Sequence, residues 1–184
     1  MTRSLPILVL LAALALDERD LPSYRNVAPE RGFTRENHFG SAAKKLITET
    51  TGSGAAFFDY DADGHLDLFV ANYVDFTIAG SKVCQDPAGA RDYCGPLQFR
   101  PVPDRLFRNE GNGTFTDVSD PSGITRAHGS GLGVASADFN GDGRLDFYVA
   151  NDGMANQLWL NRGNGVFEDE ALLAGVAFNA DGQP

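Results

Sequence analysis

Short apolar segments alternate with polar, glycine-rich turns along most of the chain after about residue 50. The segments are only three to seven residues long, which is typical of β-strands rather than of helices. Two of them, 66–72 and 145–151, are apolar on both faces, as expected for strands in sheets that are covered on both sides. The pattern therefore predicts an all-β protein built from short strands.

The strands belong to a repeat that occurs twice. Residues 104–117 and 156–169 share Leu, Asn, Gly-Asn-Gly, Phe and Asp at an offset of 52, whereas the acidic loops 59–67 and 138–146 align at an offset of 79. The first copy has 31 residues between Asn72 and Asp104, and the second has four between Asn151 and Asn156, so the first carries a 27-residue insertion.

Each copy is expected to contain four strands. The first three lie at 54–58, 66–72 and 106–108 in one copy and at 133–137, 145–151 and 158–160 in the other, and the fourth begins at Phe115 or Phe167. Asn-Gly supplies the positive φ values of a tight hairpin between the last two. Four short strands repeated in tandem indicate blades of a β-propeller.

The ends of the chain fall part-way through this pattern. Residues 24–27 with Gly32-Phe33 resemble 115–118 with Gly123-Ile124, which predicts an N-terminal strand completing another blade. About two blades cannot close a ring of the usual four to eight, so we expect a fragment of a longer protein or an assembling one. The expected divisions are a signal peptide (1–15), an N-terminal segment (16–45), a blade with the insertion (46–125), a second blade (126–178) and a linker (179–184).

The two acidic loops have the composition of calcium sites. Acidic loop 1 (59–67) and acidic loop 2 (138–146) each place oxygen side chains at positions 1, 3, 5 and 9, Gly at position 6 and a candidate carbonyl ligand at position 7, a pattern that suits Ca²⁺. The expected ligands are Asp59, Asp61, Asp63, His65 and Asp67 in loop 1, and Asp138, Asn140, Asp142, Arg144 and Asp146 in loop 2.

The alternatives to two calcium sites are limited. An EF-hand needs a Glu at position 12, where Val70 and Val149 stand, and flanking helices. Hydrated Asp/Gly turns without an ion remain the other interpretation. Loop 1 has four acids and loop 2 has three, so loop 1 should bind more tightly. A look-alike at 178–182 has Ala177 where the first Asp should be, and we interpret it as linker.

Charge and cysteines indicate an exported protein. The net charge of −10 and the scattered Arg residues argue against nucleic acid as a partner. Arg3, an apolar run over 5–16 and an Ala-Leu-Ala ending at Ala15 are typical of a secretory signal peptide, although a buried N-terminal helix is the alternative. The run is short for a membrane span. Cys84 and Cys94 then predict a disulfide rather than two free thiols, and a secreted or extracytoplasmic location, in the periplasm or at the cell surface.

The order of these motifs resembles FG-GAP repeats, also called VCBS repeats, of the integrin-α-like propeller type. The residues 54–64, 106–109 and 111–118 are most similar to the cartilage-acidic-protein-related (ASPIC/UnbV) exported bacterial proteins. The resemblance implies a seven-bladed propeller, calcium at the acidic loops and an extracytoplasmic role in binding or adhesion. It implies no catalytic activity.

We therefore expect a non-enzymatic binding or adhesion module whose propeller face takes a protein or glycan ligand. The disulfide-bearing insertion is either its recognition loop or a decoration. One alternative is the propeller portion of a polysaccharide-active enzyme, but no spacing links the remaining candidates His38, Glu49, His128 and Asp152 into a catalytic arrangement. The other is a structural scaffold for a C-terminal domain.

Overall fold

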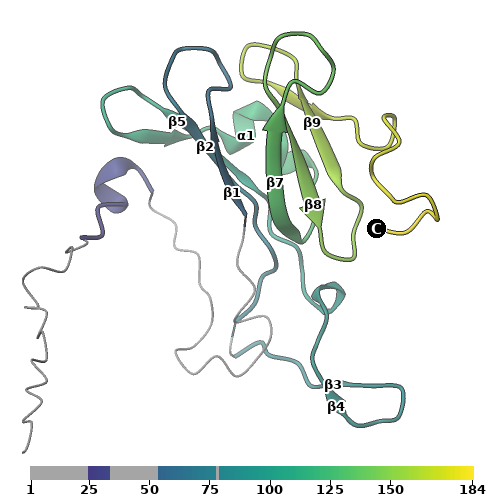
Figure 1. Ribbon diagram of the computed structural model, residues 1–184. Helices are drawn as coiled ribbons and strands as arrows, with labels where there is room; N and C mark the ends of the chain where they lie inside the picture. Colours follow the sequence, from purple (N-terminus) through teal and green to yellow (C-terminus); the bar gives the residue numbers. More distant parts are fainter. Residues whose placement is uncertain (1–24, 34–53, 78) are drawn as a thin grey trace, which may run out of the picture.

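The structure, a computed structural model, describes residues 25–33, 54–77 and 79–184, so the expected signal peptide lies outside the described residues. Two four-stranded antiparallel sheets stand side by side (Figure 1). The first contains β1 (Ala55–Phe58), β2 (Asp67–Val70), β5 (Arg105–Asn109) and β6 (Phe115–Asp117). The second contains β7 (Gly131–Ala137), β8 (Asp146–Asn151), β9 (Gln157–Asn161) and β10 (Phe167–Asp169). The all-β class and the four-stranded blades are confirmed.

The two blades have the same register. Phe69 of β2 pairs with Leu106 of β5, and Tyr148 of β8, at the offset of 79, pairs with Leu158 of β9, at the offset of 52. In both blades the strands form a meander. The turns β1–β2 and β5–β6 of the first blade therefore lie at one end of the sheet, and the β2–β5 connection lies at the other.

The main core lies between the blades. Phe58 and Phe69 of the first blade meet Phe147 of the second, with ring centroids 5.7 and 4.4 Å apart. Trp159 and Phe167 belong to the same cluster, and all five of these side chains are at most 3% exposed. Burying rings of this size is a large favourable contribution to stability, which explains the apolar residues on the face of each second strand that meets the other blade.

The innermost strands of the blades approach closely. A Cβ on Gly54 would lie 2.8 Å from the carbonyl oxygen of Leu132, and the Gly131 N–H donates to the Asn72 carbonyl at 2.8 Å. A side chain at Gly54 would push β1 away from β7. Gly54, which opens the first repeat, is therefore required by blade-to-blade packing.

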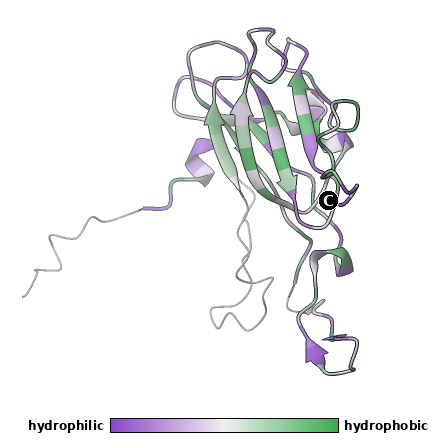
Figure 2. Cartoon of the chain, turned by 45° about the vertical axis from the view of Figure 1, so that its right-hand side comes forward, coloured by the Kyte–Doolittle hydropathy of each residue, from purple (hydrophilic) through white to green (hydrophobic). Residues whose placement is uncertain are grey.

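The insertion leaves the first blade between β2 and β5. It contains the short hairpin of β3 (Cys84–Gln85) and β4 (Arg91–Asp92), followed by the 3-10 helix η4 (Pro96–Gln98). The predicted disulfide Cys84–Cys94 is present, with Cα atoms 5.2 Å apart. The hairpin projects from the end opposite the acidic loops (Figure 1), and it carries a strand that is strongly hydrophilic (Figure 2).

The N-terminal segment differs from the predicted strand. Arg25–Val27 are not in a strand, and the 3-10 helix η2 (Pro29–Arg31) follows them. A strand here would need a partner from another blade, and the described residues supply none. The short helices α1 (Ser119–Ser122) and η5 (Ile124–Arg126) connect the blades. In the described ranges, the helices are too short and too polar to cross a membrane.

Candidate metal centre

Acidic loop 1 joins β1 to β2 and brings three carboxylates together. Asp59, Asp61 and Asp67 each offer an oxygen, and these oxygens lie within 4.8 Å of one another. Within the described residues this is the one group of three or more acidic, His or Cys side chains that could hold a metal ion. Three carboxylate oxygens on a short loop are the ligand type that Ca²⁺ prefers, so the residues of loop 1 fit the expected ion.

The carboxylates at positions 1 and 9 also hold the loop in shape. Asp59 accepts the backbone N–H groups of Asp63 at 3.1 Å and Gly64 at 2.9 Å. Asp67, which is fully buried, accepts the N–H of Tyr60 at 3.1 Å and that of Asn109 at 2.8 Å. Gly64 has a φ of 91°, which confirms the sharp turn expected at position 6.

Burial and mutual repulsion oppose the charge that the loop carries. Burial raises the pKa of Asp67 to about 6, against the hydrogen bonds from the Asn109 and Tyr60 N–H groups. Burial, followed by the nearby Asp63 carboxylate, also raises the pKa of Asp61. Two carboxylates about 5 Å apart repel by roughly 3 kcal/mol at an effective dielectric constant of 20. A divalent cation would remove this penalty.

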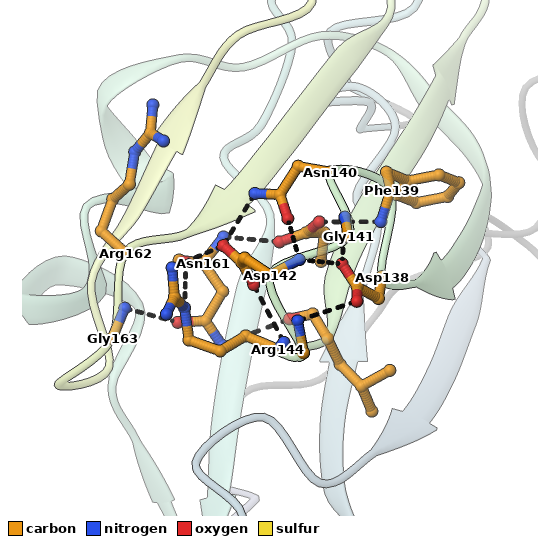
Figure 3. A network of polar contacts seen from close by, with 12 residues as sticks. Asp138, Phe139, Asn140, Gly141, Asp142, Arg144, Asn161, Arg162 and Gly163 are labelled. Carbon is orange, nitrogen blue, oxygen red and sulfur yellow. Dashed lines mark hydrogen bonds and ion pairs between the residues drawn. The ribbon is translucent and has the colours of Figure 1, made fainter.

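Acidic loop 2, between β7 and β8, has positive φ values at Gly141 and Gly143, where loop 1 has them at Ala62 and Gly64. Figure 3 shows the polar contacts of loop 2. Asp138 accepts the N–H groups of Gly141, Asp142 and Gly143 at 2.7, 3.0 and 2.8 Å. These bonds, that from Gly143 foremost, hold the pKa of Asp138 below its usual range. Asp146 is buried and accepts the N–H of Phe139 at 3.0 Å and that of Asn161 at 2.8 Å.

The two loops differ in the surroundings of the Asp at position 5, because the residue at position 7 differs. In loop 2 the Arg144 guanidinium pairs with Asp142 Oδ2, and the Asn140 Nδ2 donates to the same oxygen at 2.8 Å (Figure 3). In loop 1 the position of Arg144 is taken by His65, whose imidazole lies against Gly111. Loop 2 does not form a group of three carboxylates like that of loop 1, because Asn140 stands at position 3, where loop 1 has Asp61.

The predicted ligands are thus only partly brought together. Asp63 lies outside the loop 1 cluster, and its Oδ1 accepts the His65 N–H at 2.8 Å. The carbonyl ligands at His65 and Arg144 stay predictions. The sequence interpretation missed Asn109 and Asn161, which end the third strands and hold the ninth-position carboxylates. Both belong to the motif that recurs at an offset of 52, which was the available signal.

The remaining acid–base candidates do not gather around this site. His128 is exposed, and Asp152 accepts a hydrogen bond from the Tyr73 hydroxyl at 2.7 Å. This bond ties the insertion to the loop after β8. Asp181, in the look-alike segment, is exposed in a turn closed by Asn179. His38 and Glu49 lie outside the described residues.

Comparison with known proteins agrees with the geometry. A family model described as FG-GAP-like repeat matches residues 97–149 and 138–184. Cartilage acidic protein 1 from Mus musculus is 45% identical over 58 residues, and the proteins of the same name from Homo sapiens and Xenopus tropicalis are 43% and 41% identical over 58 residues. Each match covers 32% of this chain and 9% of the relative. The chain contains FG-GAP-like repeats and is homologous to cartilage acidic protein 1 over part of its length.

Proposed function

We propose that this chain is part of an extracytoplasmic, calcium-stabilised FG-GAP repeat module that binds a protein or glycan partner and catalyses no reaction. The observation that carries the calcium proposal is the convergence of Asp59, Asp61 and Asp67 within 4.8 Å. A calcium ion bound there would supply charge neutralisation and fix the loop.

The predicted effect of calcium is on folding and shape. The carboxylate repulsion and the burial of Asp67 disfavour the folded loop at neutral pH without a cation. A ligand that binds only the folded state stabilises it in proportion to the logarithm of its concentration, and about 100-fold above the dissociation constant gives roughly 2.7 kcal/mol.

The arrangement of the loops supports a binding role. The acidic loops project from one end of the blades, and the disulfide-tied insertion projects from the other (Figure 1). Loops on a rigid β-scaffold are common recognition surfaces. The disulfide favours an oxidising compartment.

Calorimetric titration with calcium, together with thermal unfolding in calcium and in EDTA, tests the metal proposal. We expect heat of binding and a higher unfolding midpoint in calcium. Asp61→Asn should weaken calcium uptake, because it removes one of the three carboxylates. The side chain is exposed, so the substitution should leave the fold intact. The matched control is Asp181→Asn, an exposed Asp in a similar Gly-containing turn, which should bind like the wild type. If the wild type, Asp61→Asn and Asp181→Asn each showed no heat of binding and the same unfolding midpoint in calcium as in EDTA, the proposal would be refuted.

A glycan and protein array probed in calcium and in EDTA tests the binding role. We expect retention of a ligand that depends on calcium, with the ligand recovered chemically unchanged. Recovery of a cleaved glycan would favour the enzyme interpretation instead.

A further inference from the structure

One side-chain amide touches both acidic loops. Asn161 ends β9 and is 1% exposed. Its Nδ2 donates to the carbonyl oxygen of Tyr60 at 2.8 Å and to that of Leu145 at 3.2 Å. Tyr60 is position 2 of loop 1, and Leu145 is position 8 of loop 2. A single NH₂ group therefore bridges the two loops across the interface between the blades.

The bridge continues to the ninth-position carboxylate of each loop. On one side, the N–H of Tyr60 donates to Asp67 at 3.1 Å. On the other, the backbone N–H of Asn161 donates to Asp146 at 2.8 Å, and Nε of Arg144 donates to the Asn161 carbonyl at 2.7 Å (Figure 3). Asp67, Asp146 and Asn161 are all at most 1% exposed, so water does not compete for these bonds.

The side chain of Tyr60 strengthens the same connection. It is 7% exposed and packs on the second blade, with its ring 5.8 Å from that of Phe167 and in van der Waals reach of a Cβ at Gly165. Loop 1 thus packs against the β9–β10 hairpin. A change in the order of loop 1 should therefore alter the packing of the residues that support loop 2.

We infer that Asn161 couples the two acidic loops, so that calcium in one raises the affinity of the other. The inference rests on the proposed calcium binding. When an ion orders loop 1, the peptide of Tyr60 is fixed, and its carbonyl fixes the Asn161 amide. The second N–H of that amide then holds the Leu145 carbonyl next to Asp146. The first ion offsets the entropy lost when the interface becomes ordered, so the second ion binds a loop that is already ordered.

The first blade supplies a matched control for this role. Asn109 has the same place at the end of β5, where its N–H donates to Asp67 at 2.8 Å and its Nδ2 donates to the Leu66 carbonyl at 3.0 Å. In the described part of the chain its amide contacts one acidic loop, its own. Asn109 therefore shares the local role of Asn161 and lacks the bridge.

The test measures the two loops separately. The N–H groups of Gly64 and Gly143 donate to Asp59 and Asp138, so their amide NMR signals report loop 1 and loop 2 during a calcium titration. Asp61→Asn disables loop 1 at an exposed residue and leaves Asn161 untouched. We expect the calcium dissociation constant of loop 2 to rise by roughly fivefold or more, the lower range of allosteric coupling. Because coupling is reciprocal, Asp142→Asn should weaken loop 1 by a similar factor.

A second experiment tests whether Asn161 transmits the coupling between the two loops. In an Asn161→Ala background, adding Asp61→Asn should no longer change the affinity of loop 2, whereas in an Asn109→Ala background it should still do so. The Asp61→Asn arm stands on its own if Asn161→Ala fails to fold.

The outcomes separate the two proposals. Two ions bound with the loop 2 affinity unchanged by Asp61→Asn would overturn the coupling and leave the calcium proposal intact. A single ion bound by the wild type would also overturn it. The absence of any calcium uptake by the wild type would overturn the proposed function, and the coupling with it.

Discussion

Asp104, which precedes β5, is predicted to make the stability of the fold depend on pH. The side chain is 1% exposed, and its Oδ1 accepts the N–H of Asn72 at 2.8 Å. Its Oδ2 has no hydrogen-bond partner among the described residues. Burial raises the pKa of Asp104 from 3.8 to about 7, although the bond from Asn72 works against the rise.

The size and direction of the effect follow from these values. Between pH 4 and 7 the folded protein keeps a proton on Asp104 that the unfolded chain releases. Stability from this group is therefore complete below about pH 4 and is lost as the pH rises through 7. A shift of about three pKa units corresponds to roughly 4 kcal/mol.

Asp104→Asn should remove this dependence. The second blade already has Asn156 at the equivalent position, and its Oδ1 accepts the N–H of Asn151 at 2.9 Å in the same way. Above pH 8 the variant should exceed the wild type in free energy of unfolding by up to about 4 kcal/mol, because the buried charge is gone. Near pH 4 the two proteins should be nearly equal.

Urea unfolding of both proteins at intervals from pH 4 to pH 9 measures the difference. Groups that titrate in both proteins cancel in that difference, which isolates Asp104. The reciprocal variant Asn156→Asp serves as a control and should lose stability as the pH rises, by a smaller amount because Asn156 is only half-buried. A difference between wild type and Asp104→Asn that stays flat across this range would refute the reasoning.

Three further predictions concern the loops and the insertion. Gly141→Ala should cost about 1 kcal/mol in free energy of unfolding, measured by urea titration, because φ is 77° there and a Cβ would meet nothing within 4 Å. Arg144→His, which copies loop 1, should tighten calcium binding at loop 2 by roughly tenfold in calorimetry, since it removes a charge beside Asp142; weaker binding would instead make Arg144 a support for that carboxylate. Reducing the disulfide Cys84–Cys94 should lower the free energy of local opening in the insertion by up to about 3 kcal/mol, measured by amide hydrogen exchange, and should leave exchange in the blades unchanged.

The blades could be predicted because the signal for them is local and occurs twice. Strand 66–72 was expected from its apolar faces and appears as β2, and the equal registers of the two sheets follow the two offsets of the repeat. The insertion was located by the difference between those offsets. Its disulfide was predictable since two cysteines in a chain expected to be exported have few other uses.

The details of the candidate metal centre were less predictable, because they depend on groups far apart in the sequence. Positions 1, 3, 5 and 9 carry oxygen side chains in both loops, with Asn140 in place of Asp61 at position 3. Only side-chain placement shows that Asp63 lies outside its cluster and that Arg144 pairs with Asp142. The bridge from Asn161 to Tyr60 spans 101 residues. It exists only because the blades stack, and no spacing within one repeat encodes it.

The segments 24–33 and 115–124, which resemble each other in sequence, share a close contact with a neighbouring hairpin. Gly32 and Gly123 have φ values of 94° and 88°, and each follows a short helical turn. A Cβ on Gly32 would lie 2.0 Å from the Phe115 carbonyl oxygen, and one on Gly123 would lie 3.1 Å from that of Phe167, which is the equivalent residue of the second blade. The apolar residue after each glycine then packs on the blade that follows: the half-buried ring of Phe33 contacts Phe107 edge-on and Phe115 at a tilt, and Ile124 is fully buried in the cluster that includes Trp159 and Phe167. The sequence match therefore marks the point at which the chain passes close to a neighbouring hairpin. A glycine suits this point because it has no Cβ and adopts a positive φ readily.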